Sequence, residues 1–402
     1  MRIMHIITRL IIGGAQENTV LSCEGQHDRG HAVMLATGPE TGPEGSLLPR
    51  ARDGGYRLAC LPAMRRAIHP WADAWAFHEI RTLIAAFRPD VVHTHSSKAG
   101  VIGRAAAWHA RVPAVIHTIH GLPYHPYQSR LKNALYVYSE KSAARKCHRI
   151  ACVADAMRRQ ALAAGVGRES QYTVVYSGME TDAYLQGPDD RDQTRRSLGI
   201  EPDEVVVGTV ARLFELKGHD DLLDVLPALL ERHPRLRLLW VGDGSRRDRL
   251  ERRMAELGVS DRVVLAGLVN PEQVPRYLRA MDLLAHPSYR EGLPRAVVQG
   301  MLVGLPVVAY DCDGAPEVCV EGETGMLVPT GDVAALGEAL LWMLDHPERG
   351  RAMGRAARAR CAEQFSAETM VEALDRLYRR TLADRGCRVD GRAADEPARS
   401  RA

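Results

Sequence analysis

The 402-residue chain lacks the cysteine spacing of metal and redox sites, and it lacks a long apolar run. None of its eight cysteines forms a C-x-x-C pair or gathers with histidines, so we interpret them as scattered core thiols in a reducing compartment. The segment MRIMHIITRLII is too short and too often interrupted by charge for a signal peptide or membrane span. We therefore expect a cytoplasmic protein without a metal ion or cofactor.

Lysine is also scarce, with five residues against 48 arginines. The net charge of +3 is unevenly spread, because residues 1–180 carry +9 and residues 181–402 carry −6. The basic first half suits an anionic partner, such as a phosphate-bearing acceptor or a membrane surface. Drift in solvated surface charge is the alternative explanation. We expect no nucleic-acid partner.

The most informative stretch is EGLPRAVVQ at 291–299. A buried strand is expected over 281–286 before it, and Pro294 fits the first position of a helix that runs to about Val303. The stretch is therefore predicted to be a strand–loop–helix corner.

Such a corner favours an anion, because the first backbone N–H groups of a helix have no partner within it. Here those groups are predicted to belong to Gly292 and Leu293. Glu291 and Gln299 are eight residues apart, roughly 12 Å along a helix, so they could bracket a phosphate group.

Strand and helix signals alternate along both halves of the chain, which predicts parallel sheets covered by helices on both faces. In the first half, Gly13 and Gly14 lie between a strand and a helix, where they permit close backbone approach. Tight turns alone explain most such glycine pairs. The segment HTHSSKAG at 93–100 follows the end of a strand, where ligands usually bind. Its residues 96–98 could receive a phosphate, and capping of the helix by serine is the alternative.

The segment HTIHGLPYHPY at 117–127 is dense in histidine and tyrosine. Two histidines three apart could indicate a metal, but no carboxylate or cysteine accompanies them and the stretch does not offer the helical geometry of zinc motifs. We interpret His117 as a hydrogen-bonding residue of the strand end. The helix expected over 129–147 carries basic and aromatic residues, so it could lie against an anionic membrane, or bury its apolar stripe and solvate its charges.

In the second half, Arg212 and Lys217 lie in a loop between the strand expected over 205–210 and a helix that begins at His219. Arginine can clamp phosphate oxygens in pairs, while lysine supplies a compact charge. A surface ion pair of Lys217 with Glu215 is the alternative.

Taken together, these motifs resemble the retaining glycosyltransferases of family 4, over roughly residues 1–382. The E-G-L-P corner resembles the E-x7-E signature of that family, except that Gln299 stands where the family has a second Glu. An amide offers one acceptor and one donor group, whereas a carboxylate can accept from two hydroxyls. Nucleotide affinity or preference is therefore the property that this departure affects.

The resemblance implies the α/β GT-B architecture, in which two Rossmann-like, doubly wound domains face a central cleft. We accordingly predict an acceptor-side domain at 1–180, a linker at 181–204, a nucleotide-sugar-binding domain at 205–365 and a helix at 366–384 that crosses back to the first domain. The Arg- and Ala-rich residues 385–402 are predicted to be a disordered tail.

The resemblance also implies roles for individual residues. The catalytic residues would be His120, Arg212, Lys217 and Glu291. The donor-binding residues would be Gly14, Gly267, Leu268, Gly292, Leu293, Pro294 and Gln299. The acceptor-binding residues would be Gly13, His95, Ser96 and Lys98.

The implied reaction moves a sugar from a nucleotide diphosphate, with UDP favoured, to an acceptor hydroxyl, with retention and without a metal. The acceptor would be a lipid-linked or envelope saccharide, and the protein could touch the inner face of the membrane. A nucleotide-sugar epimerase is one alternative, but it should carry several acid/base carboxylates, and Glu291 is the main one here. A non-catalytic nucleotide-sugar sensor is the other, distinguished by tight binding without turnover.

Overall fold

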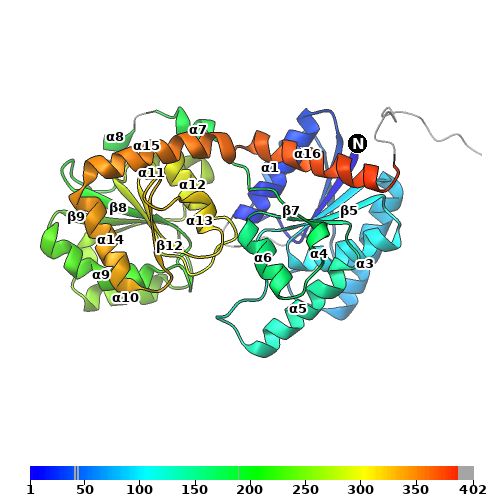
Figure 1. Cartoon of the computed structure of the whole chain (residues 1–402), viewed down its shortest axis with the longest axis horizontal. Coiled ribbons are helices and arrows are strands. Elements are labelled where there is room, and N and C mark those ends of the chain that lie inside the picture. The colour runs from blue at the N-terminus through cyan, green and yellow to red at the C-terminus, as the bar shows by residue number, and fades with distance from the viewer. Residues whose placement is uncertain (40–41, 43–44, 189, 388–402) are drawn as a thin grey trace, which may run out of the picture. The chain divides into compact units, whose positions relative to one another are not determined.

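The computed structural model of the chain describes residues 1–39, 42, 45–188 and 190–387 (Figure 1). The chain divides into two compact units. The first contains Met1–Gly178 and the described residues 367–387, and the second contains Met179–Ser366. The last helix therefore belongs to the first unit, although it follows the second unit in sequence.

A seven-stranded sheet forms the middle of the first unit, and all of its strand pairs are parallel. From edge to edge the strands are β3 (Arg57–Cys60), β2 (Ala32–Thr37), β1 (Arg2–Ile7), β4 (Val91–His95), β5 (Ala114–Ile119), β6 (Arg149–Cys152) and β7 (Tyr172–Val174). Strands β4 and β5 are buried along their whole length, as expected for a sheet covered on both faces. Chain order reverses between β1 and β4, so this pair is the topological switch point.

Helices cover both faces of this sheet. Successive strand residues point to opposite faces, so neighbouring residues of one strand pack against different helices. Ile3 and Val91 pack in one core cluster with α16 (Ala367–Asp384), on the face that also carries α1 (Gly14–Asp28). Their neighbours Met4 and Val92 pack in another cluster with α3 (Pro70–Phe87) and α4 (Ser97–His109). The other helices of this unit are α2 (Leu48–Asp53), α5 (Arg130–Ala144), α6 (Asp155–Ala163) and the 3-10 turn η1 (Glu169–Gln171).

Helix α16 packs on the first unit through one apolar face. Met370, Leu374 and Tyr378 recur every four residues, the spacing that places side chains on one side of a helix. All three are buried, in one cluster with Ile3 of β1 and Leu21 of α1. This burial explains why the chain returns to the first unit after completing the second.

The second unit contains a six-stranded parallel sheet of the same kind. From edge to edge its strands are β10 (Val263–Gly267), β9 (Leu236–Val241), β8 (Val205–Val210), β11 (Leu283–His286), β12 (Val307–Asp311) and β13 (Met326–Pro329). Its switch point lies between β8 and β11. The predicted α/β class with two doubly wound parallel sheets is confirmed.

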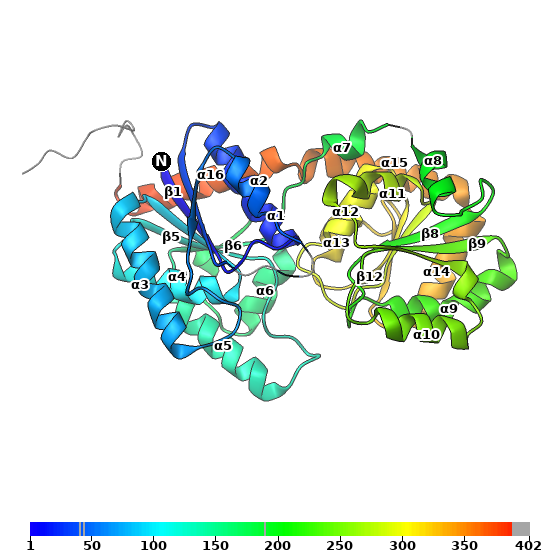
Figure 2. The same cartoon turned by 180° about the vertical axis from the view of Figure 1, so that it is seen from behind.

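Helices α9 (His219–Arg232), α10 (Arg247–Glu256) and α14 (Val333–Asp345) share one core cluster with the strands of the second sheet. Figure 2 shows α11 (Val274–Arg279), α12 (Arg295–Leu302) and α15 (Pro347–Gln364) on the opposite side of that sheet. The remaining short elements are α7 (Asp182–Leu185), α8 (Arg191–Ser197), η2 (Ser260–Arg262), η3 (Pro271–Gln273) and α13 (Ala315–Val318).

Residues 181–204 are part of the second unit, whereas the sequence predicted a linker there. Arg195 is only 2% exposed, and its guanidinium donates to the Asp282 carboxylate at 2.7 Å and to the carbonyl of Ala280 at 2.9 Å. Arg191 pairs with the same carboxylate at 2.5 Å. The charged run looked like a solvated linker because its partner lies 87 residues later in the sequence.

Two further stretches differ from the sequence expectation or fall beyond the structure. Between Thr37 and Gly55 the chain is rich in glycine, proline and glutamate, which predicts an irregular surface loop, but helix α2 lies within this stretch. Of the predicted tail, 385–387 complete a turn after α16, and 388–402 lie outside the described residues. Within the described ranges, no helix is both long and apolar enough to cross a bilayer.

Candidate functional site

The loops that follow β8 and β11 are joined at the switch point of the second sheet. The backbone N–H of Tyr289 donates to the carbonyl of Leu216 at 3.0 Å. Gly218 has φ of +70°, and a Cβ atom at this position would lie 1.9 Å from the carbonyl oxygen of Pro287. Only glycine fits so close a backbone approach, and the two loops are therefore held in fixed register.

This register brings together the predicted catalytic residues Lys217 and Glu291. The Lys217 ammonium lies 2.6 Å from Glu291 Oε1 and 3.3 Å from the hydroxyl of Ser288. His286 Nε2 lies 3.0 Å from the same Glu291 oxygen. Since a carboxylate only accepts hydrogen bonds, His286 carries its proton on Nε2. The partner of Lys217 is Glu291, whereas the alternative considered from sequence was Glu215, which pairs with Arg246 instead.

The electrostatic surroundings keep Glu291 ionised. Burial alone would raise the pKa of this carboxyl group, but the charge of Lys217 and the hydrogen bond from His286 outweigh burial and hold the pKa well below its ordinary value. The backbone N–H of Glu291 donates to Asp313 Oδ2 at 2.9 Å. Glu291 is thus fixed as an acceptor of hydrogen bonds, which suits the binding of hydroxyl groups.

Arg212 lies in the loop after β8, the loop that also carries Lys217, and this loop contacts the loop after β9. The guanidinium of Arg212 stacks on the ring of Phe214 at 4.5 Å from the centroid. Gly242 donates its N–H to the carbonyl of Gly267 at 2.9 Å, and a Cβ atom at Gly242 would lie 2.1 Å from the carbonyl oxygen of Ala211. The loops after β8, β9 and β10 therefore form one continuous backbone surface at the carboxyl edge of the sheet, where Leu268 is 52% exposed.

Helix α12 begins one residue later than the sequence predicted, with Pro294 as its N-cap. The carbonyl of Pro294 accepts from the N–H groups of Val297 and Val298. Gly292 and Leu293 immediately precede the cap, where the helix dipole favours an anion. Gln299 is partly buried on the same helix. The predicted donor residues of this corner thus lie on one loop and one helix.

The first unit has a comparable edge at its own switch point. Gly13 caps α1, and Gly14 is its first residue. The hydroxyls of Thr8 and Ser96 lie 2.8 Å apart, and Ser96 has φ of +60° just before α4. Lys98 pairs with Asp73 at 2.5 Å and donates to a loop carbonyl. Its ammonium thus already has two protein partners, which the sequence did not suggest.

A cavity of about 310 Å³ lies at this edge of the first unit. Its lining includes His120, Ser96 and Ala15. His120 is partly buried, and its Nε2 lies 3.0 Å from Nδ1 of His95. His117 also lines the cavity, but its ring is 3% exposed and lies 2.9 Å from the hydroxyl of Thr94, in keeping with the bonding role predicted for it.

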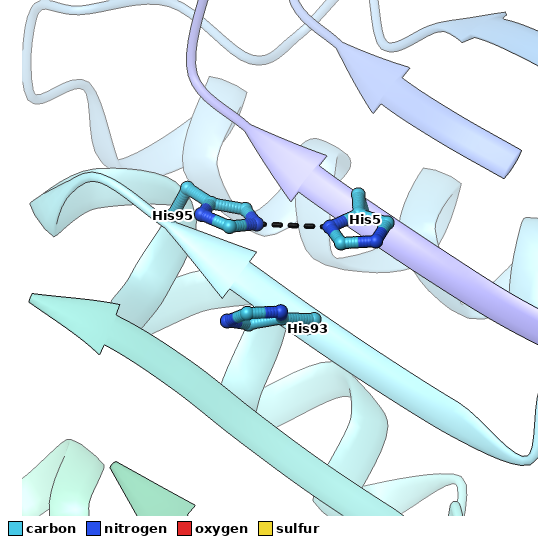
Figure 3. A group of neighbouring side chains, drawn as sticks. All are labelled: His5, His93 and His95. Atoms are coloured by element: carbon cyan, nitrogen blue, oxygen red, sulfur yellow. Dashed lines mark hydrogen bonds between the residues drawn. The ribbon is translucent and has the colours of Figure 1, made fainter. Parts of the chain in front are cut away.

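Figure 3 shows a group that sequence reasoning missed, formed by His5 of β1 with His93 and His95 of β4. One ring nitrogen from each residue lies within 4.8 Å of the others. His95 is 1% exposed and stands behind His120, away from the position expected for a direct acceptor ligand. The sequence signal for this group was the alternation of side chains along β4, which places His93 and His95 on the same face of the sheet.

Two doubly wound parallel sheets, each with a polar loop site at its switch point, define an α/β protein of the doubly wound class, and the comparisons with known proteins narrow this class. The family described as "Glycosyltransferase Family 4" matches residues 12–183, and "Glycosyl transferases group 1" matches residues 190–360. The chain belongs to this glycosyltransferase family, and it is a glycosyltransferase of the nucleotide-sugar-dependent kind. The predicted GT-B fold is confirmed.

Individual relatives agree with this assignment. The chain is 24% identical to UDP-Gal:alpha-D-GlcNAc-diphosphoundecaprenol alpha-1,3-galactosyltransferase of Escherichia coli, over 94% of this chain and 96% of that protein. It is 33% identical to D-inositol 3-phosphate glycosyltransferase of Nocardia farcinica, over 78% and 72%. Its fold matches Anabaena HepE in complex with UDP-glucose, with a TM-score of 0.80 at 22% identity, over 94% and 99%.

Proposed function

We propose that the chain is a retaining, metal-independent glycosyltransferase that moves a sugar from a UDP-sugar to a hydroxyl of a lipid-linked or envelope saccharide. The UDP donor is supported by the E. coli relative, whose name specifies UDP-Gal, and by the Anabaena structure, which holds UDP-glucose on the same fold. The lipid-linked acceptor is supported by the diphosphoundecaprenol substrate of the E. coli relative.

The observation that carries the proposal is the ion pair between Lys217 and Glu291 at the switch point of the second sheet. In this proposal Lys217 and Arg212 bind the diphosphate, together with the N–H groups at the start of α12. Glu291 accepts hydrogen bonds from hydroxyls of the donor sugar. Gln299 binds the ribose, and the backbone near Gly267 meets the base.

The chemistry that we propose is electrostatic. As the sugar–oxygen bond breaks, negative charge grows on the departing diphosphate, and fixed cations stabilise that charge more than they stabilise the ground state. The departing phosphate takes the proton of the acceptor hydroxyl on the same face of the sugar, which gives retention. We propose no side-chain nucleophile for this reaction.

The acceptor is proposed to bind the first unit at the edge formed by Gly13 and Ser96. His120, in the lining of the cavity there, would orient the transferred sugar. The ammonium of Lys98 already pairs with Asp73 and donates to the carbonyl of Ala67. Lys98 is therefore proposed to hold the loop at Ala67 in place and to contribute positive charge near the acceptor, without binding the acceptor directly.

A peripheral contact with an anionic membrane is supported by exposed apolar side chains beside basic ones. On α5, Leu131 is 83% and Tyr138 is 74% exposed. Trp71 and Trp75 are exposed on α3, and α4 packs against both α3 and α5. The exposed basic residues of and beside α5 are Arg130, Lys132, Lys141, Arg145 and Lys146. Tryptophan and basic side chains together suit the interface of an anionic bilayer.

The donor can be tested by thermal unfolding with UDP, GDP or ADP, each with and without EDTA. A ligand at 100 times its dissociation constant stabilises the folded state by about 2.7 kcal/mol. We expect UDP alone to raise the melting temperature of the wild type, without metal, and to fail on Lys217→Ala. Arg232→Ala is the matched control, because it removes an exposed cation at the far end of α9. If GDP or ADP acts instead of UDP, the proposed donor is wrong.

Product stereochemistry tests retention and separates the alternative functions. With UDP-galactose or UDP-glucose as donor, NMR of the new glycosidic bond should show the α configuration of the donor. An epimerase would interconvert the two UDP-sugars without forming a glycoside. A sensor would bind UDP-sugar tightly and release no UDP. Either result, obtained with lipid-linked saccharides present, would contradict the proposed transfer.

A further inference from the structure

A line of four hydrogen-bonded residues connects helix α1 with the cavity of the first unit. Gln26 Oε1 lies 2.8 Å from His5 Nε2, and His5 Nδ1 lies 2.9 Å from His95 Nε2 (Figure 3). His95 Nδ1 in turn lies 3.0 Å from His120 Nε2. Gln26, His5 and His95 are at most 1% exposed, so water cannot substitute for any of these bonds.

The direction of the bonds follows from the buried end of the line. The amide nitrogen of Gln26 donates to the hydroxyl of Tyr378 at 3.3 Å, which leaves the amide oxygen to accept from His5. Burial lowers the pKa of His5 to about 4 and that of His95 well below its ordinary value, so both rings are neutral near pH 7. A neutral imidazole has one donor and one acceptor nitrogen.

These two facts fix every proton in the line. His5 donates from Nε2 to Gln26, so its Nδ1 accepts from His95. His95 therefore carries its proton on Nε2, and its Nδ1 accepts. The last bond must then be donated by Nε2 of His120.

We propose that Gln26, His5 and His95 are positioning residues that hold the ring of His120 with its proton on Nε2, donated to His95, and so fix the side chain that is to orient the transferred sugar. The contact of His120 with a sugar rests on the proposed function, whereas the tautomer of His120 does not depend on that function. In a neutral histidine, the hydrogen bond that one ring nitrogen makes decides whether the other ring nitrogen carries the proton.

His93 completes the network beside this line. Its Nδ1 lies 2.5 Å from the hydroxyl of Tyr378, and its Nε2 lies 2.6 Å from the hydroxyl of Thr118. All six ring nitrogens of His5, His93 and His95 therefore have partners. A buried polar network that is fully satisfied holds one arrangement, because every alternative leaves a costly unpaired group. Tyr378 belongs to α16, so the last helix of the chain also supports the line.

A metal ion on the three histidines is the competing use of this group. Metal ligands point their in-plane lone pairs at one position. Here the rings of His5 and His95 are nearly parallel, with an interplanar angle of 18° and centroids 5.2 Å apart. Binding a metal would also break the hydrogen bonds described above. The geometry thus favours the hydrogen-bonded line over a metal site.

The direct test is the tautomer of His120 in the wild-type protein. Long-range 1H–15N correlation spectra of protein labelled with 15N-histidine distinguish the two tautomers, and His120→Asn assigns the signals of His120. We expect Nε2–H for His5, His95 and His120. A wild-type His120 with its proton on Nδ1 would overturn the proposal. So would stoichiometric zinc in the purified protein whose chelation shifts the signals of His5 and His95.

Two substitutions of His5 test the coupling. His5→Asn keeps an acceptor oxygen close to the position of Nδ1, whereas His5→Leu removes the acceptor and allows His95 to turn its proton toward His120. We expect the asparagine variant to retain Nε2–H on His120 and the leucine variant to lose it. An unchanged tautomer in a folded His5→Leu protein would contradict the coupling.

Turnover gives the functional readout. We expect kcat for UDP release from UDP-glucose or UDP-galactose to fall in His5→Leu by on the order of ten- to hundredfold, by analogy with the loss of the hydrogen-bond partner behind a metal-binding histidine. His5→Asn should retain most of kcat. The melting shift caused by UDP should stay unchanged in both, since UDP is proposed to bind the second unit. If the tautomers behave as expected but no sugar turns over, the proposed function fails and the positioning line stands.

Discussion

The ammonium group of Lys217 lies 2.6 Å from Oε1 of Glu291, although 74 residues separate the two in sequence. The pair joins the loop after β8 to the loop after β11, the two strands between which the order of the second sheet reverses. A cation and a carboxylate so placed can serve the two halves of one ligand, with the cation near the phosphates and the carboxylate near the sugar hydroxyls.

Substitution of Lys217 tests this division of roles. In Lys217→Ala we expect kcat to fall by about 10²–10³, as for the loss of a group that stabilises transition-state charge. Lys217→Arg should recover only part of kcat, because a planar guanidinium does not replace a compact ammonium. UDP release from the donor sugar provides the measurement. Near-normal turnover in Lys217→Ala would remove the lysine from the phosphate site.

The depressed pKa of Glu291 predicts how stability depends on pH. Folding lowers this pKa below its ordinary value of 4.5, so the ionised group contributes stability above that pH. The contribution is lost as the pH falls toward the folded pKa. We therefore expect the melting temperatures of wild type and Glu291→Gln to differ most at pH 6–8, and the difference to shrink progressively as the pH falls below 4.5.

Comparison with the variant separates this effect from the buried histidines, which titrate in both proteins. Glu251→Gln is the control, because Glu251 is in an exposed pair with Arg247 and such pairs contribute little. A gap between wild type and Glu291→Gln that stays constant down to pH 3 would show that the carboxylate gains nothing from Lys217.

Substitution of Gly218 should displace the loop of Lys217 and leave the charge of the site unchanged. In Gly218→Ala, the new Cβ would lie 1.9 Å from the carbonyl oxygen of Pro287, so the loop of Lys217 must move. Gly199→Ala is the matched control, since Gly199 has a similar φ of +65° and no atom within 4 Å of the added Cβ. Both variants pay about 1–2 kcal/mol for the left-handed backbone. Only Gly218→Ala should also lose turnover, and equal turnover in the two would contradict the fixed register of the loops.

Much of the fold could be predicted because the signals are local. The strand expected over 205–210 is a short, largely apolar run, and its predicted bounds match those of β8. The structured run at 181–204 could not be predicted, because its burial depends on the distant Asp282. Composition shows the charges of Arg191 and Arg195 but not the carboxylate that neutralises them.

The candidate site could likewise be predicted only in part. Lys217 and Glu291 could be named from motif and loop position, but their mutual contact could not, because it depends on strand order in the folded sheet. The pairing of β1 with β4 likewise brings His5 beside His95. In sequence, His5 was only an interruption of an apolar segment, and no local pattern indicates its partner 90 residues away.

Gln299 offers a prediction of improved binding. A carboxylate can accept from both ribose hydroxyls, whereas the amide oxygen is a weaker acceptor. Hydrogen bonds to charged groups exceed neutral ones by about 1 kcal/mol, so Gln299→Glu should lower the Kd for UDP by about fivefold. Titration calorimetry with UDP measures this, and Gln299→Ala shows the value without either group. A large loss in Gln299→Glu would show that the amide has a specific partner.

The exposed apolar residues of α5 and α3 predict binding to anionic vesicles. The protein should sediment with vesicles that contain phosphatidylglycerol and not with phosphatidylcholine alone, because each basic side chain near an anionic surface contributes about 1 kcal/mol. Leu131→Glu with Leu135→Glu, on the exposed face of α5, should abolish sedimentation, and raised salt should weaken that of the wild type.

The two tryptophans of α3 test whether this helix takes part in the membrane contact. Trp71→Ser with Trp75→Ser should weaken sedimentation if α3 and α5 meet the membrane together, and should have no effect if α5 acts alone. Leu257→Glu is the control, since Leu257 is 41% exposed in the second unit, after α10. The UDP-induced melting shift should stay unchanged in all of these variants, because the proposed nucleotide site lies in the second unit at the loops after β8 and β11. Binding to phosphatidylcholine with the same affinity would show that charge has no part in the contact, and the basic residues of α5 would then only solvate the surface.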